Sequence, residues 1–190
     1  MSRILVDQIR SNSASADAMT LDGSGNVTFP ANVTCSGTAT GMGGGKILQY
    51  VHDIKTDVTS FTSTTAAVIP NLSASITLSS SSNKVIVICN IMNGRTNGNQ
   101  VATYRIFRDS TDLYTGAGDA RAGHFVSYAG NSTENMETFA YVHEDSPNDT
   151  SAHTYTVKVR GDSTSQIRIN QYHGGSYTYQ SSITLLEVAA

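Results

Sequence analysis

The sequence predicts an all-β protein in which a thin N-terminal segment precedes an antiparallel β-sandwich. Charged residues make up only 14% of the 190 residues, and the formal net charge is −3. Disorder by composition requires high net charge or many prolines, and this chain has three prolines. Serine and threonine fill about a quarter of it. Together with the β-branched residues and nine tyrosines, they favour extended strands with hydroxyl-bearing solvent faces.

The chain changes character near residue 45, which separates a leader of residues 1–45 from a domain of residues 46–190. The boundary is the stretch 41–45, in which four of five residues are glycine. Clustered glycines are costly to order and allow almost any backbone angle, so we expect a hinge there. Residues 32–41 before it are expected to be extended, and the leader holds too few large apolar side chains for a core of its own.

A short hairpin is expected inside the leader. Two apolar pairs at a period of two, Met19 with Leu21 and Val27 with Phe29, flank the turn-forming stretch 22–26, as in two strands about a tight turn. An isolated hairpin this thin is marginal in water. Either the leader is flexible, or it is ordered as a short shaft by burying its apolar residues against other chains.

The domain of residues 46–190 is built from extended segments separated by turn signals. Residues 152–160 alternate cleanly, with Thr154, Thr156, Lys158 and Arg160 on one face and Tyr155, Val157 and Val159 on the other. The expected strands are 46–52, 56–62, 64–69, 72–78, 84–92, 100–108, 112–115, 121–128, 134–144, 152–160, 166–172 and 181–188. Many short strands in one domain predict an antiparallel sandwich or jelly roll.

No catalytic, cofactor or metal motif stands out, so we expect a non-enzymatic protein without a cofactor. The five histidines form no zinc-protease pattern, and no phosphate-binding loop or nucleophile elbow is present. The stretch 143–149 contains Glu144, Asp145 and Asp149 and could gather oxygen ligands for calcium. The alternative is an acidic turn between two strands, which we favour.

Charge and hydropathy argue against two classes of partner. A sequence pI near 5.9 without a basic cluster argues against nucleic acid binding. No run approaches the roughly 20 apolar residues that span a bilayer, so no membrane insertion is expected. Cys35 and Cys89 either form a disulfide or, as we favour, leave Cys89 as a small buried hydrophobic residue.

Two loops are candidates for surface recognition. The first surrounds a Gly-Gly turn and is rich in tyrosine, whose ring and hydroxyl suit contacts with sugars or proteins. Its candidate residues are Tyr172, His173, Tyr177 and Tyr179. The alternative is a hairpin whose rings pack on cross-strand neighbours. The second is the Gly-rich segment 115–121, with Asp119 and Arg121 as its candidates.

Several segments carry a likeness to one known group of proteins. They are residues 1–10, 21–29, 44–49, 80–87, 105–111 and 182–188. Together they resemble fibre-like virion proteins, tail fibres or appendages, of marine tailed bacteriophages, including cyanophages. The resemblance implies a homotrimer with a jelly-roll-like knob, assembled in the host cytoplasm and located in the virion. It also implies an N-terminal segment that contacts other virion proteins, with Ile4, Leu5, Val6 and Ile9 as the anchor.

The expected function is therefore a structural one, with attachment to a host-surface glycan or protein as the role of the knob. One alternative is a capsid decoration or head-fibre protein. Another is a freestanding β-sandwich module that binds carbohydrate or protein and carries a disordered leader. A depolymerase is the weakest class, since it needs paired carboxylates in a groove and the sequence offers no specific pair.

Overall fold

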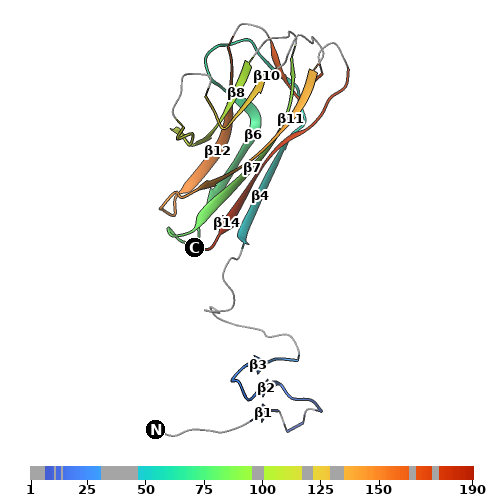
Figure 1. Cartoon of the computed structure of the whole chain (residues 1–190), viewed down its shortest axis with the longest axis vertical. Coiled ribbons are helices and arrows are strands. Elements are labelled where there is room, and N and C mark those ends of the chain that lie inside the picture. The colour runs from blue at the N-terminus through green and yellow to red at the C-terminus, as the bar shows by residue number, and fades with distance from the viewer. Residues whose placement is uncertain are drawn as a thin grey trace. The chain divides into compact units, whose positions relative to one another are not determined.

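The computed structural model describes residues 7–10, 12–13, 15–30, 47–95, 101–116, 122–128, 135–162, 166–172 and 176–190. All regular structure in these residues is strand, so the all-β prediction is confirmed, and they include no helix that could cross a membrane. The chain forms two compact units, Met1–Met42 and Gly43–Ala190 (Figure 1). The predicted extended segment 32–41 and glycine hinge 41–45 lie outside the described residues.

The first unit is a small antiparallel sheet in the order β1-β2-β3. Its strands are β1 (Gln8–Ile9), β2 (Met19–Leu21) and β3 (Val27–Thr28). The turn between β2 and β3 is held by the Asp22 carboxylate, which accepts hydrogen bonds from the backbone N–H groups of Ser24 at 2.9 Å and Asn26 at 2.8 Å. Gly25 takes the left-handed backbone angle that this turn requires, φ 81°. The predicted hairpin is therefore confirmed.

The second unit consists of two antiparallel sheets packed face to face (Figure 1). Sheet 1 runs β11-β7-β14-β4, and the far end of β7 also pairs with β13, which pairs with β5. Sheet 2 runs β6-β12-β8-β10, with β9 paired to β8. The strands of sheet 1 are β4 (Ile47–Lys55), β5 (Thr59–Phe61), β7 (Lys84–Arg95), β11 (Asn135–Asp145), β13 (Ile167–Ile169) and β14 (Ser181–Val188). Those of sheet 2 are β6 (Ala67–Thr77), β8 (Val101–Arg108), β9 (Thr111–Asp112), β10 (Phe125–Tyr128) and β12 (Ala152–Gly161).

The strand order is that of a jelly roll. Counted along the chain without the short strands β5, β9 and β13, the main strands of the domain pair as sixth-third-eighth-first in sheet 1. In sheet 2 they pair as second-seventh-fourth-fifth. This is the order that two interleaved Greek keys produce. The predicted jelly-roll-like sandwich is confirmed.

The core lies between the two sheets and follows the period of two that the sequence shows. Tyr155, Val157 and Val159 of β12 face inward and are buried, and sheet 1 contributes rows such as Ile183 with Leu185. Cys89 is fully buried among them, and burial raises the pKa of its thiol to about 12. Its predicted role as a small buried hydrophobic residue is confirmed, while Cys35 lies outside the described residues.

Several expected strands are shorter in the structure: 56–62 is reduced to Thr59–Phe61, 112–115 to Thr111–Asp112 and 166–172 to Ile167–Ile169. One prediction was wrong in a further respect. Residues 64–69 and 72–78 were expected as separate strands around Pro70, yet β6 runs unbroken from Ala67 to Thr77. Asn71 takes a φ of 55°, and the register with β12 shifts between Thr156 and Lys158. Because β6 is an edge strand of sheet 2, Pro70 needs no ladder partner for its missing N–H, and a bulge absorbs the irregularity.

The two ends of the sandwich carry different parts of the chain. Val188 pairs with Ile47, whereas Ser181 pairs with Lys55, so the chain enters and leaves the sandwich at the same end. The carboxyl ends of β4, β7, β10 and β12 lie at the opposite end of the sandwich, which we call the distal end (Figure 1).

Asn170 organises the described part of the distal end. Its side chain is fully buried and its φ is 65°. The Nδ2 group donates to the carbonyl oxygens of Lys55 at 2.8 Å and Asp57 at 3.1 Å, and the Oδ1 atom accepts from Ser181 Oγ at 2.6 Å. These hydrogen bonds join the end of β4 and the residues after it to the start of β14, and so they hold these segments together at the distal end.

Candidate functional site

A pocket of about 360 Å³ lies on the outer face of sheet 2. Its volume falls at the lower end of the range for small-molecule sites, about 300–1,000 Å³. It is lined by Thr64, Thr65, Ala66, Thr103, Arg105, Phe107, Asp112, Lys158 and Arg160. Three of these residues belong to the turn that leads into β6, and the others to β8, β9 and β12.

Strand register brings the lining residues of β8 and β12 together. Side chains alternate across a strand, so the buried residues of β8 and β12 leave the others on the outer face. Lys158 lies directly opposite Arg105, and Arg160 lies opposite Thr103. Side chains paired in this way have Cβ atoms about 4.5–5.5 Å apart, so the three cations form one cluster.

The pocket is positively charged although the chain as a whole has a net charge of −3. Its lining includes three cations, Lys158, Arg105 and Arg160, and one carboxylate, Asp112. The guanidinium of Arg105 contacts Asp112 Oδ2 at 2.8 Å and donates through Nε to the carbonyl oxygen of Ala122 at 2.8 Å. One of the three positive charges is therefore neutralised and its side chain is fixed.

The other two cations are less restrained. The ammonium of Lys158 lies 3.7 Å from the ring centroid of Phe107, a cation–π contact. Arg160 makes no hydrogen bond or ion pair with any residue that the structure describes. Like charges directly opposite on a sheet destabilise it, and a bound anion would remove that repulsion. The arrangement is suited to binding a small anion.

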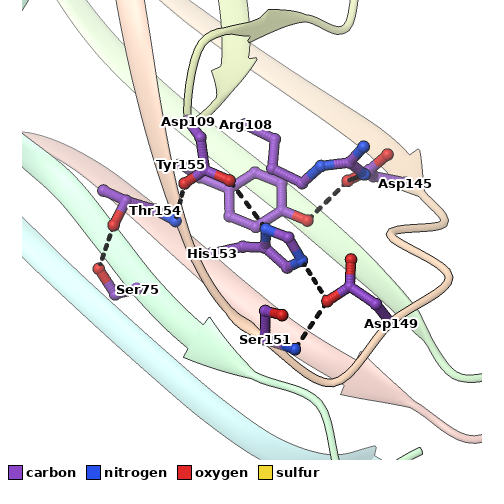
Figure 2. A network of polar contacts seen from close by, with 9 residues as sticks. All are labelled: Ser75, Arg108, Asp109, Asp145, Asp149, Ser151, His153, Thr154 and Tyr155. Carbon is purple, nitrogen blue, oxygen red and sulfur yellow. Dashed lines mark hydrogen bonds and ion pairs between the residues drawn. The ribbon is translucent and has the colours of Figure 1, made fainter. Parts of the chain in front are cut away.

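A second polar cluster connects the β8–β9 turn with the β11–β12 connection at the other end of sheet 2 (Figure 2). The ring of His153 contacts Asp109 through Nδ1 at 2.8 Å and Asp149 through Nε2 at 3.0 Å. Burial opposes the charged ring, but the bonds to the two carboxylates outweigh it, so the pKa of His153 is raised. Both carboxylates are satisfied when the ring carries two N–H donors, so the protonated ring forms an imidazolium bridge between them.

The same cluster continues through Tyr155. Its hydroxyl donates to Asp145 Oδ2 at 2.6 Å, and Arg108 Nη1 donates to the same atom at 2.6 Å (Figure 2). Burial, followed by the hydrogen bond to Asp145, raises the pKa of Tyr155.

This cluster favours the acidic-turn interpretation of residues 143–149 over a calcium site. Asp145 and Asp149 are engaged by side chains of the protein. No group of three or more His, Cys, Asp or Glu residues suited to a metal ion occurs in the described parts of the chain. Both ring nitrogens of His153 are also bonded, so the cluster holds turns together and leaves no free imidazole base.

The predicted tyrosine loop is partly described. Tyr177 is 71% exposed and Tyr179 is also exposed, whereas Tyr172 is half-buried. A bridge between Gln171 and Thr178 closes the loop, which agrees with a hairpin-like turn. Two tyrosines are thus presented at the distal end, and what they bind stays a prediction.

The remaining predicted site residues give little further geometry. His173, Asp119, Arg121, Ile4, Leu5 and Val6 lie outside the described residues. Ile9 is in β1 and about half-exposed, and its anchoring role stays a prediction. The structure does not bring the described candidates into the basic pocket, whose lining contains none of them.

Sequence reasoning missed the basic pocket. It placed Lys158 and Arg160 on the same face of a strand, which was the available signal. It could not place Arg105 beside them, because the pairing of β8 with β12 joins residues far apart in the chain. The threonines before β6 were assigned to a strand and not to the rim of a pocket.

Comparisons with known proteins add little. No protein-family model and no curated protein matches the sequence. Among solved structures, a chain of the T13 infectious bursal disease virus particle is similar to 86% of this chain, with a TM-score of 0.41 and 11% identity. Chains of the Gx and Gt strains of that virus give TM-scores of 0.42, with 8% and 11% identity over 85% and 92% of this chain. This chain spans less than half of theirs, 44%, 48% and 47%.

Proposed function

We propose that this chain is a structural virion protein, a homotrimeric fibre or appendage of a tailed bacteriophage. Its leader attaches to other virion proteins, and its jelly-roll knob faces the host surface and binds a glycan or protein there. The proposal gives the chain no catalytic role. The observation that carries it is the contrast between the two units, one with a core and one without.

The leader unit contains no buried residue among those described. Ile9, Val27 and Phe29 are 48%, 47% and 48% exposed, and the strands are two or three residues long. A sheet of this size cannot bury enough apolar surface to be stable alone. Three copies that share these side chains on one axis would supply the missing core.

The outer face of sheet 1 supports association between knobs. Tyr50 on β4 is 63% exposed and Val142 on β11 is 60% exposed. Register places Leu186 and Ile86 in the same row as Tyr50, so apolar side chains continue over β4, β14 and β7 and the row ends at Glu144 on β11. Exposed apolar surface that extends over several strands is typical of a protein–protein interface, and a second copy of this chain is the partner that the leader also requires.

One alternative has a specific observation in its favour. The basic pocket on sheet 2 would serve a freestanding carbohydrate-binding module as well as a fibre. In that case the leader is a flexible tail and the knob acts as a monomer. A capsid decoration protein would share the trimeric architecture and differ only in its place on the particle.

Limited proteolysis of the leader tests the proposal. In a trimer with a shared leader core, Phe29→Asp should speed cleavage of the leader at least tenfold, because a charge enters the shared apolar core. Thr28→Asp is the matched control, since Thr28 directly precedes Phe29 and successive side chains of an extended chain point to opposite faces, and it should change the rate little. Rapid cleavage of the leader in the unmutated protein and in both variants, at every protein concentration, would support the freestanding module and contradict the fibre.

A further inference from the structure

We propose that the pocket on sheet 2 binds a carboxylated sugar, a uronic-acid residue of a surface glycan. This inference rests on the proposed attachment function and names its ligand class. Three cations and one carboxylate leave an excess of two positive charges in the pocket.

The distribution of that charge favours a compact anion over a polymer of phosphates. The basic cluster covers three side chains, Arg105, Lys158 and Arg160, in a chain whose net charge is −3. Nucleic acid needs a basic stripe that follows its backbone. A single carboxylate, in contrast, is satisfied by one or two cations at a short distance.

Arg160 and Lys158 are the groups available to that carboxylate. Arg160 has no polar partner among the described residues, and its planar guanidinium can donate two parallel hydrogen bonds to a carboxylate. Lys158 lies two residues earlier on the same face of β12 and adds a second positive charge. Arg105, held by Asp112 and the Ala122 carbonyl oxygen, forms a fixed side of the pocket.

The rest of the lining fits a sugar ring better than a bare anion. The hydroxyls of the exposed Thr64 and Thr65 can exchange hydrogen bonds with sugar hydroxyls, since each hydroxyl both donates and accepts. Phe107 and Ala66 supply apolar surface for the C–H groups of the ring. A pocket of about 360 Å³ is also larger than an isolated carboxylate or chloride requires.

Calorimetric titration of the full-length protein with sodium glucuronate, glucose and sodium acetate tests the inference. Glucuronate should bind at least tenfold more tightly than either glucose or acetate, because only glucuronate uses both the cations and the hydroxyls. Arg160→Gln should weaken glucuronate at least tenfold, and Lys158→Gln should also weaken it. Lys84→Gln, which removes a cation paired with Glu144 on sheet 1, is the matched control and should leave binding unchanged.

Three results would overturn the inference. The first is that glucuronate does not bind, and the second is that glucuronate and acetate bind equally well. The third is that the Arg160→Gln variant binds glucuronate as tightly as the unmutated protein and has the same melting temperature. A protected leader without glucuronate binding would reject this ligand and leave the fibre standing. Glucuronate binding by a monomer with an unprotected leader would support this ligand and reject the fibre.

Discussion

The imidazolium bridge of His153 gives a stability prediction with a defined pH dependence. His153→Phe keeps a ring of similar size and removes the contacts with Asp109 and Asp149. The side chains of both aspartates are nearly half exposed, so water replaces the lost partner and both contacts stabilise the fold only modestly. The variant should therefore lose about 1–2 kcal/mol of unfolding free energy at pH 5.5.

The sign of the pH dependence follows from the pKa shifts. The pKa of His153 is raised in the folded protein above its ordinary value of 6.5. Its contribution is fully present below pH 6.5 and disappears as the pH rises through the folded pKa. The pKa values of Asp109 and Asp149 are lowered by their hydrogen bonds, chiefly from His153 and from the Ser151 N–H respectively. Both carboxylates therefore stay charged at pH 5.5.

Urea unfolding of the original protein and the variant at pH 5.5 and pH 9 measures the difference. The loss of about 1–2 kcal/mol at pH 5.5 should shrink toward zero at pH 9. Other titrating groups, such as the half-buried His124, are common to both proteins and cancel in the difference. An equal loss at the two pH values would refute the imidazolium bridge and leave only a packing role for the ring.

Three further substitutions test the packing of the sandwich by urea unfolding. Leu185→Ala should cost about 2–5 kcal/mol, since it opens a cavity between the sheets; a loss below 1 kcal/mol would contradict the core. Glu187→Gln should cost about 1–3 kcal/mol at pH 7, because three bonds of 2.7 Å from Ser79 and Asn83 converge on one carboxylate oxygen. That cost should fall at pH 3, as the pKa of Glu187 is lowered by these bonds against the effect of burial. Gly94→Ala should cost about 1–3 kcal/mol, since a Cβ would lie 2.0 Å from the carbonyl oxygen of Gln171; an unchanged midpoint would place the backbones further apart.

The strands could be predicted from the sequence because each has a one-sided pattern. In β12, Tyr155, Val157 and Val159 are buried exactly where alternation predicts, and the turn at Asp22 follows from local side-chain bonds. Local chemistry also explains where the prediction was wrong. Pro70 predicts a break between two strands, but at a sheet edge its missing N–H interrupts no hydrogen bond of the sheet. Whether a strand lies at an edge is a property of the whole fold and not of the local sequence.

The candidate site depends on contacts that the sequence does not reveal. The buried Asn170 joins Lys55 and Ser181 across long stretches of chain. The sequence placed Asn170 in the expected strand 166–172, whereas β13 ends at Ile169, and nothing local in the sequence indicates its long-range hydrogen bonds. The basic pocket likewise requires the register of β8 against β12. A tyrosine-rich loop can be predicted from local composition. A pocket formed by Arg105 and Arg160 can be predicted only when the pairing of the strands is known.

The mass of the full-length protein in solution, by light scattering after size exclusion, tests the central claim most directly. One chain is 20.2 kDa, so three times that mass, 60.6 kDa, is expected for the proposed fibre. A trimer would account for the leader without a core and for the apolar outer face of sheet 1. A mass of 20.2 kDa at all concentrations would contradict the fibre and leave a monomeric binding module with a tail.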